Sequence, residues 1–520
     1  MARKNFFLLL LTALLCCTLC ACSMRDEIDE GDEILGTPLE EMDETLQQHE
    51  PALINPVLTL PYLQDATFDP VLCADGAQQY IASLLYEGLF VLDETFTPQN
   101  VLCESFSYDE ETLTYRFLLR GDVEFSDGTL LTADDVLASY RRASTSARYG
   151  ARFSRVAAMS AEDERTFVVK LTQPCALFTS LADIPIVKSG TESDIAPLGT
   201  GPYLFVTDAG GASLLANSAW WRGETQPVEC IRLVGTKSVD TLVYLFSACQ
   251  TQLFTCDLTG TDSFSATGSI DLFNFPTTVF QYLICNMNGP LSDPALRRAV
   301  SCGFDRSLLV AGNLSNHATV AELPISPASP LYPTALSQTI LRPKFDVSLA
   351  ECAAGVPERP LVFIVNSEND FKVSAAEYIA HALTTKGLPV EVTALAWEEY
   401  MEALTAGSFD LCYAEVKLTA DWDFSPLVSA NGALNYGGVA SPILDTLLAE
   451  FRKAPSETTA NALYTFIVRQ APIVPICFKS YSLLAQDGTL HKASPTASNL
   501  FYDLESWSFS DVIIENGKQK

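Results

Sequence analysis

The residue types that could carry catalysis or bind a metal are sparse in this sequence. Asp421 and Asp423 flank Trp422, and alternate residues of a strand point the same way, which is one arrangement for an acid–base pair of a glycosidase. Such pairs more commonly cap a loop or face solvent, and no partner acid can be assigned. The four histidines are too scattered for a histidine-based zinc site: His49, His317, His381 and His491. We therefore expect that this protein is not an enzyme and has no catalytic residue.

The sequence also lacks the short motifs of cofactor and metal binding. His-Glu-x-x-His, Gly-x-Ser-x-Gly, Walker-loop and calcium-loop patterns are absent. Gly199-Thr200-Gly201-Pro202-Tyr203 resembles the start of a dinucleotide fingerprint, but the third glycine is missing and Pro202 interrupts it. We interpret this segment as a tight structural turn. No cofactor and no metal site are predicted.

Composition narrows the possible partners. The chain has 520 residues, with 32 Lys and Arg against 64 Asp and Glu, and a formal net charge of -32. This acidity excludes a nucleic-acid partner, because binding to phosphates depends on Lys and Arg. With 48% hydrophobic residues, most of the chain should be globular, in roughly three domains by length.

The N-terminus has the order of a secretory signal, in which Arg3 and Lys4 precede an apolar run over 6–15. Leu19-Cys20-Ala21-Cys22 resembles a bacterial lipobox, whose last cysteine is acylated. We predict a signal peptide over 1–21 and acylation of Cys22, with Cys20 as the alternative. Acyl chains on Cys22 would anchor the exported protein on the outer face of the cell membrane or facing the periplasm. Residues 22–50, rich in Asp and Glu, are predicted to be an acidic tether.

Eleven cysteines follow Cys22, an odd number for an exported chain. Many of them come directly after an apolar residue, as in Leu102-Cys103 and Leu411-Cys412. No later pair has the spacing of metal ligands. Buried cysteine behaves as a small hydrophobic residue, so we expect packing in the core rather than disulfides.

Local sequence patterns predict one hairpin and the starts of two helices. The alternation over 112–125 predicts a hairpin that turns at Arg120-Gly121-Asp122. A helix should begin at Thr132, with Asp135 near its positive end. Another should begin at Asp293, because Pro294 suits the first helical position.

The segment 360–416 reads strand, helix, strand, helix, strand, with expected strands at 361–365, 389–395 and 409–416. This order implies a parallel sheet in an α/β lobe. The early region mixes hairpins with helices and predicts a different, α+β unit. Two unlike lobes in an exported protein suggest a cleft between them, where ligands commonly bind.

Separated blocks of the sequence resemble the bacterial family 5 extracellular solute-binding proteins, the peptide- and nickel-binding lipoproteins of ABC importers. The blocks cover about residues 60 to 480 in the order of that family. They are Phe68-Asp69-Pro70, Leu85-Tyr86-Glu87-Gly88-Leu89, Tyr115-Arg116-Phe117 through Thr129, Leu131 to Val136, Gly199 to Tyr203, Trp220-Trp221, and Ser292 to Val300 with Asp305-Arg306. Each block is modest alone, and their combination is specific.

The resemblance implies an α/β, two-lobed fold of the periplasmic-binding-protein type II (cluster C) kind, with an extra α+β domain and a hinge. We expect a first lobe over 51–280 with the extra domain near 78–190, a second α/β lobe over 281–485, and a C-terminal return to the first lobe over 486–520. Closure of the lobes on the ligand would be a population shift, because only the shut form lets the ligand touch both lobes.

The resemblance also implies candidate ligand-binding residues. Ala420-Asp421-Trp422 resembles the family's Ala-Asp-Tyr segment, whose Asp pairs with a peptide's α-ammonium group, so Asp421 is the first candidate. Thr419 and its neighbour Leu418 could offer backbone groups to an extended peptide. The remaining candidates are Trp422, Tyr436, Asn435 and Glu87. The family usually continues with Asp-Pro soon after this segment, whereas this chain has Asp423-Phe424-Ser425-Pro426.

The function implied is that of the lipid-anchored substrate-binding subunit of an ABC importer, which captures peptides and delivers them to a membrane permease. It would act as a monomer and without a cofactor. Two alternatives stay open at this point. One is a binder of another solute, such as a nickel chelate, and the other is a surface sensor or adhesin that kept the fold without serving a permease.

Overall fold

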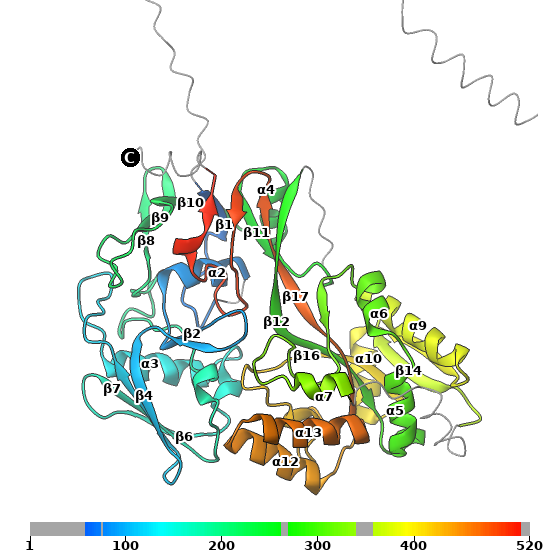
Figure 1. Cartoon of the computed structure of the whole chain (residues 1–520). Helices are drawn as coiled ribbons and strands as arrows, with labels where there is room; N and C mark the ends of the chain where they lie inside the picture. The colour runs from blue at the N-terminus through cyan, green and yellow to red at the C-terminus, as the bar shows by residue number, and fades with distance from the viewer. Residues whose placement is uncertain (1–57, 74–75, 262–268, 340–356, 511–520) are drawn as a thin grey trace, which may run out of the picture. The chain divides into compact units, whose positions relative to one another are not determined.

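The computed structural model describes residues 58–73, 76–261, 269–339 and 357–510. Its largest sheet has seven strands in the order β11-β17-β12-β16-β14-β15, with β13 paired to β17 (Figure 1). These strands are β11 (Leu253–Cys256), β12 (Ile270–Cys285), β13 (Ala318–Val320), β14 (Leu361–Asn366), β15 (Val390–Leu395), β16 (Leu411–Lys417) and β17 (Ile473–Gln486). The long antiparallel strands β12 and β17 form the middle of this sheet.

The predicted parallel unit is confirmed. β14 pairs in parallel with both β15 and β16. The helices α9 (Asp370–Thr385) and α10 (Trp397–Ala406) provide the crossovers. Helix α10 ends at Gly407, whose φ of 68° is a left-handed conformation that glycine adopts without steric cost.

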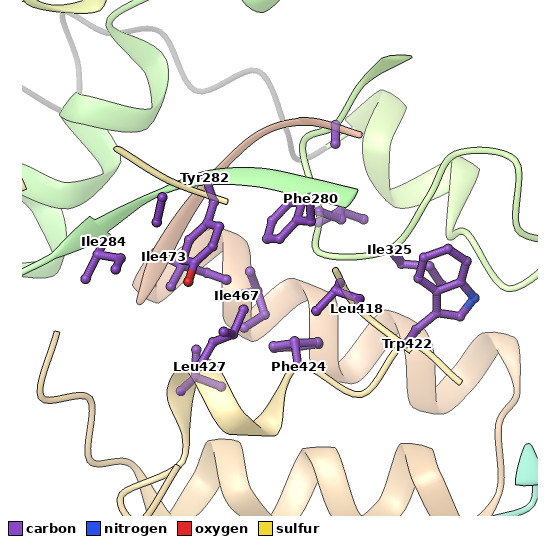
Figure 2. Close-up of a cluster of buried hydrophobic side chains, with 14 of the residues drawn as sticks. Phe280, Tyr282, Ile284, Ile325, Leu418, Trp422, Phe424, Leu427, Ile467 and Ile473 are labelled. Atoms are coloured by element: carbon purple, nitrogen blue, oxygen red, sulfur yellow. The ribbon is translucent and has the colours of Figure 1, made fainter. Parts of the chain in front are cut away.

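Alternate residues of the large sheet enter two separate hydrophobic cores. Leu283, Phe363 and Tyr413 point into one, with α5 (Pro294–Cys302), α6 (Arg306–Asn313) and α9. Tyr282, Ile364 and Cys412, each one residue away, point into the other, with α10, α12 (Pro442–Lys453) and α13 (Glu457–Gln470). This follows from the two-residue period of a strand. Figure 2 shows the second core, with Tyr282 beside Ile473 and Trp422 near Ile325.

A four-stranded sheet in the order β1-β10-β9-β8 organises the region before residue 250. Its strands are β1 (Leu58–Leu63), β8 (Tyr203–Asp208), β9 (Gly211–Ala216) and β10 (Cys230–Thr236). The helices of this region are α2 (Gly76–Leu85) and α4 (Val239–Ser247). Leu490, Phe501 and Trp507 from the C-terminal segment share its core with Leu60 and Ile231.

A second four-stranded sheet, β4-β5-β7-β6, has its own core. Its elements are β4 (Cys103–Asp109), β5 (Thr114–Leu119), β6 (Val156–Ala161), β7 (Thr166–Leu171) and helix α3 (Ala133–Ser144). The hairpin predicted over 112–125 is wrong. Strand β5 pairs with β4 before it and with β7 after it, while 123–125 contribute only an isolated bridge between Glu124 and Leu130. The alternation correctly predicted that Tyr115 and Phe117 are buried. A pattern of buried residues does not, however, show which strand pairs with which.

Both predicted helix starts are confirmed. Thr132 caps α3, and its hydroxyl and Asp135 form a reciprocal capping box. Asp293 accepts a hydrogen bond from the Ala295 amide, and Pro294 opens α5. The remaining short elements are β2 (Phe90–Leu92), β3 (Pro98–Asn100), η1 (Gly150–Phe153), η2 (Phe178–Leu181), η3 (Pro290–Ser292), α7 (Thr334–Thr339), α11 (Ser425–Val428), β18 (Leu490–Lys492), η4 (Leu504–Ser506) and β19 (Ser508–Phe509).

The ten cysteines within the described ranges are not joined in disulfides, and seven of them are buried. The predicted signal peptide, acylated Cys22 and acidic tether lie outside the described residues. Within the part of the chain that the structure describes, no helix is both long enough and apolar enough to cross a bilayer. Over the same ranges, the structure shows no cluster of three or more His, Cys, Asp or Glu side chains able to hold a metal ion.

Candidate ligand-binding site

A cavity of about 620 Å³ lies between the end of β16 and the region of the two four-stranded sheets. From the large sheet it is lined by Thr278 and by residues 417–420. Its other walls come from segments around residues 82–101, 147–152 and 497–505. A volume of this size suits a small organic ligand or a short peptide, and walls from distant segments allow the ligand to stabilise their association.

The chain leaves β16 with unpaired backbone amides at the cavity. The Leu418 amide still donates to Thr278 O at 2.9 Å, continuing the pairing of β16 with β12. The amides of Thr419 and Ala420, the next two residues, donate no hydrogen bond within the described ranges. Both residues line the cavity. These N–H groups are available to the carbonyl groups of an extended ligand.

Glu87 lines the same cavity and is held by two donors. Its Oε2 accepts hydrogen bonds from Trp221 Nε1 at 2.8 Å and from Thr200 Oγ1 at 3.0 Å. Burial raises the pKa of Glu87 above its ordinary value, despite these hydrogen bonds. Gly199 and Gly201, on either side of Thr200, lie against the end of α2 and so bring Thr200 close to Glu87. A Cβ atom on Gly201 would come within 2.6 Å of Leu84 O. The turn expected at Gly199–Tyr203 is thus a close backbone contact that glycine permits.

Asp421 lies outside this cavity, in a buried cluster of charges. Its Oδ1 accepts a hydrogen bond from Thr419 Oγ1 at 2.5 Å, and its Oδ2 lies 3.5 Å from Arg155 Nη1. Arg155 also forms an ion pair with Asp423, which Arg452 approaches at 3.6 Å. Burial and the neighbouring Asp423 charge raise the pKa of Asp421. Although burial acts in the opposite direction, Arg155 and Arg452 lower the pKa of Asp423.

Comparisons with known proteins agree with this architecture. Residues 97–433 match the family model of the bacterial extracellular solute-binding proteins, family 5 Middle. The chain belongs to this family. The glutathione-binding protein GsiB of Escherichia coli (strain K12) is 25% identical over 446 residues, which cover 79% of this chain and 86% of the relative.

Solved structures share the fold. The periplasmic murein tripeptide-binding protein MppA, in its unliganded open form, superposes with a TM-score of 0.71 at 18% identity and covers 88% of this chain and 98% of its own. A nickel ABC transporter protein from Bacillus halodurans gives a TM-score of 0.68 at 20% identity over 85% and 98%. This family 5 protein therefore has the two-lobed α/β fold that the sequence implied.

The other sequence candidates of this family 5 protein fall in different places. Trp422 is buried in the core, where it contacts Phe96 and Phe478 edge-to-face (Figure 2 labels Trp422). Asn435 holds its own loop, since its side chain donates to Ser429 O and Val439 O at 2.9 and 2.7 Å. Tyr436 packs partly buried against the same core. Glu87 and Thr419 line the cavity; Trp422, Asn435, Tyr436 and Asp421 do not.

Sequence reasoning missed the basic residues in and beside the cavity of this family 5 protein. Arg155 pairs with Asp421 and Asp423, and no local pattern around it indicates this. Arg148 and Lys417 line the cavity. Lys417 had a usable signal, because it directly precedes the Leu418-Thr419 segment already expected to meet the ligand.

Proposed function

We propose that this protein is the lipid-anchored substrate-binding subunit of an ABC importer and that its cargo is peptides. Membership of the family makes it an exported solute-binding protein of the ABC-importer type. The observation that carries the peptide assignment is the pair of unpaired amides at Thr419 and Ala420 on the cavity wall. An extended peptide offers a regular series of carbonyl groups to such a strand end.

The names of the relatives support the same class of cargo. GsiB is a glutathione-binding protein and MppA binds a murein tripeptide. The cavity contacts both the strand that ends at Lys417 and the segments before residue 270, so a bound peptide favours the closed form. The closed form then docks on a permease, and the protein is held at the membrane through acyl chains on Cys22.

Several finer assignments belong to this proposal. The lobe boundaries are those expected from the sequence, 51–280, 281–485 and 486–520. The protein works as a monomer and transfers no covalent bonds. Thr419 and Glu87 contact the ligand directly, because they line the cavity. A role for Asp421 in binding the α-ammonium group requires that Arg155 share or release its carboxylate.

The test is native mass spectrometry of the full-length chain, purified gently in mild detergent, before and after denaturation. We expect a family of bound masses that fragment as peptides. Ala497→Trp, which fills an exposed position of the cavity wall, should remove this cargo. Ala158→Trp, at an exposed position of β6 outside the cavity, is the matched control and should retain it.

Other outcomes would overturn parts of the proposal. A single bound mass that contains a metal would show that the cargo is a metal chelate and not a peptide. This outcome would agree with the nickel protein among the structural relatives. Peptides that stay bound equally well to Ala497→Trp would remove the cavity as their site. A chain that binds no peptide from any pool offered would contradict the peptide assignment and favour the sensor or adhesin alternative.

A further inference from the structure

The basic side chains of Lys417 and Arg148 both line the cavity, and neither has a carboxylate partner within the described ranges. Lys417 is the last residue of β16, and Arg148 precedes the short helix η1. Both are exposed to the cavity they line. Within the described ranges, neither Lys417 Nζ nor the Arg148 guanidinium has a carboxylate within ion-pairing distance. Arg148 does lie over the ring of Tyr149, at 5.1 Å from its centroid.

The charges around Lys417 are mostly positive. The cavity walls partly desolvate Lys417 and lower its pKa, Arg148 and Arg152 lower it further, and Asp183 acts in the opposite direction. Asp183 already forms an ion pair with Arg152. The three cations therefore face one carboxylate that is engaged elsewhere. An excess of positive charge at a partly desolvated site is unfavourable until an anion arrives.

The acidic groups of the cavity do not neutralise this cluster. Asp93 accepts hydrogen bonds from Thr95 and Gln99 in its own turn. Glu505 faces Arg222 at 3.6 Å. Asp503, which is exposed, shares the neighbourhood of Tyr502 with Asp93. Glu87, another acid of the cavity wall, accepts hydrogen bonds from Trp221 and Thr200. Within the described ranges, none of these acids forms an ion pair with Lys417 or Arg148.

We propose that Lys417 and Arg148 form a subsite for a carboxylate of the bound peptide, either its C-terminus or an acidic side chain. The inference rests on the proposed function and assigns the charge of the cargo. Lys417 stands two residues before the unpaired amide of Thr419, so one ligand reaches both the amide and the ammonium group. Charge-assisted hydrogen bonds from ammonium and guanidinium groups are among the strongest that a carboxylate makes.

The subsite also couples the carboxylate to closure. Lys417 belongs to the large sheet, whereas Arg148 follows α3 of the β4-β5-β7-β6 sheet. Bringing these cations together without an anion costs repulsion, and a carboxylate between them converts this repulsion into attraction. A ligand that lacks the carboxylate gains less from the closed form.

The experiment compares short random peptides in matched chemical forms. Stripped full-length chain is mixed with a pool that lacks Asp and Glu, supplied as the free acid or as the C-terminal amide. A third pool is amidated and carries one Glu. Bound peptide is counted by native mass spectrometry. We expect the amide pool without Glu to bind about tenfold more weakly than at least one carboxylate-bearing pool.

The two carboxylate sources separate in this design. Preference for the free acid assigns the C-terminus, and preference for the amidated pool with Glu assigns a side chain. Lys417→Gln combined with Arg148→Gln should abolish the preference between the pools. Lys170→Gln and Arg141→Gln, exposed residues outside the cavity, should preserve the preference.

Equal binding of all three pools to the wild-type chain would overturn the carboxylate subsite and leave the peptide function standing. Binding of none of them would instead overturn the proposed function, and the inference with it. The comparison of pools on the wild-type chain needs no variant to fold, so it decides the matter by itself.

Discussion

Arg155 and Asp421 are 266 residues apart in the sequence, yet Arg155 Nη1 and Asp421 Oδ2 lie 3.5 Å apart in the structure. Arg155 directly precedes β6, and Asp421 follows β16. The same guanidinium pairs with Asp423. One side chain therefore links the β4-β5-β7-β6 sheet to the loop that leaves the seven-stranded sheet. Both regions contribute walls to the cavity. The ion pair therefore helps to hold the two walls together.

Arg155→Met should lower the free energy of unfolding by about 3–5 kcal/mol, because it leaves the buried Asp421 carboxylate without a cation and Asp423 with Arg452 alone. The side chains of Asp421 and Asp423 are only 2% and 11% exposed. Urea denaturation measures the change. Replacing both aspartates by Asn in the Arg155→Met background should restore much of the stability.

Arg116→Met is the matched control for that experiment. Arg116 pairs with Glu162, and the two side chains are 46% and 50% exposed. Exposed ion pairs contribute little, so the change should stay below about 1 kcal/mol. Equal losses of unfolding free energy for Arg155→Met and Arg116→Met would show that the buried ion pairs stabilise the protein no more than an exposed one does.

Asp421→Asn tests how this residue affects the ligand. Its carboxylate is held by Arg155 and Thr419 and does not line the cavity. We therefore expect the variant to weaken binding of peptides with a free α-amino group and of their N-acetylated forms by the same factor. Isothermal titration of matched peptide pairs gives both affinities. A loss confined to the free-amine peptides would instead establish the direct ion pair that the family resemblance implies.

Glu87→Gln should change how stability depends on pH. Burial raises the pKa of Glu87, so the folded state binds its proton more tightly than the unfolded state does. The stability that this group contributes is full below its unfolded pKa and is lost as the pH rises through the folded pKa. Gln keeps an acceptor for Trp221 Nε1 and Thr200 Oγ1. The variant should therefore gain unfolding free energy relative to wild type between about pH 4 and about pH 7.

Urea denaturation at several pH values in that window measures the difference. Glu398→Gln, at an exposed position of α10, is the control for the loss of an exposed carboxylate. A difference for Glu87→Gln that does not grow with pH would contradict a raised pKa.

The cysteines should divide into reactive and protected groups. Cys249 is exposed, whereas Cys103 and Cys412 are buried, and burial raises the pKa of each of the latter two to about 12. Since the thiolate is the reactive form, iodoacetamide near pH 8 should label Cys249 quickly and the other two only after unfolding in urea. Peptide mapping by mass spectrometry follows each site. Rapid labelling of Cys103 or Cys412 in the native chain would show that these positions open.

The parallel unit over 360–416 could be predicted because its signals are local. Apolar strands of the right length, Gly387 and Gly407 at helix ends, and Asp293 before Pro294 each specify their own backbone. Pairing is different. The alternation at Tyr115 and Phe117 specified which face is buried, but the partner strands β4 and β7 were chosen by contacts remote in sequence.

The site divides in the same way. The sequence by itself determined that residues 418–421 follow a buried strand and resemble a ligand-binding segment, and it determined family membership through many separated blocks. Only the tertiary structure decided that Thr419 faces the cavity while Asp421 pairs with Arg155. Only it decided that Arg148 joins Lys417. The physical reason is that local propensity depends on neighbours in sequence, whereas the partner of a charge depends on which distant side chain the packed core brings within reach.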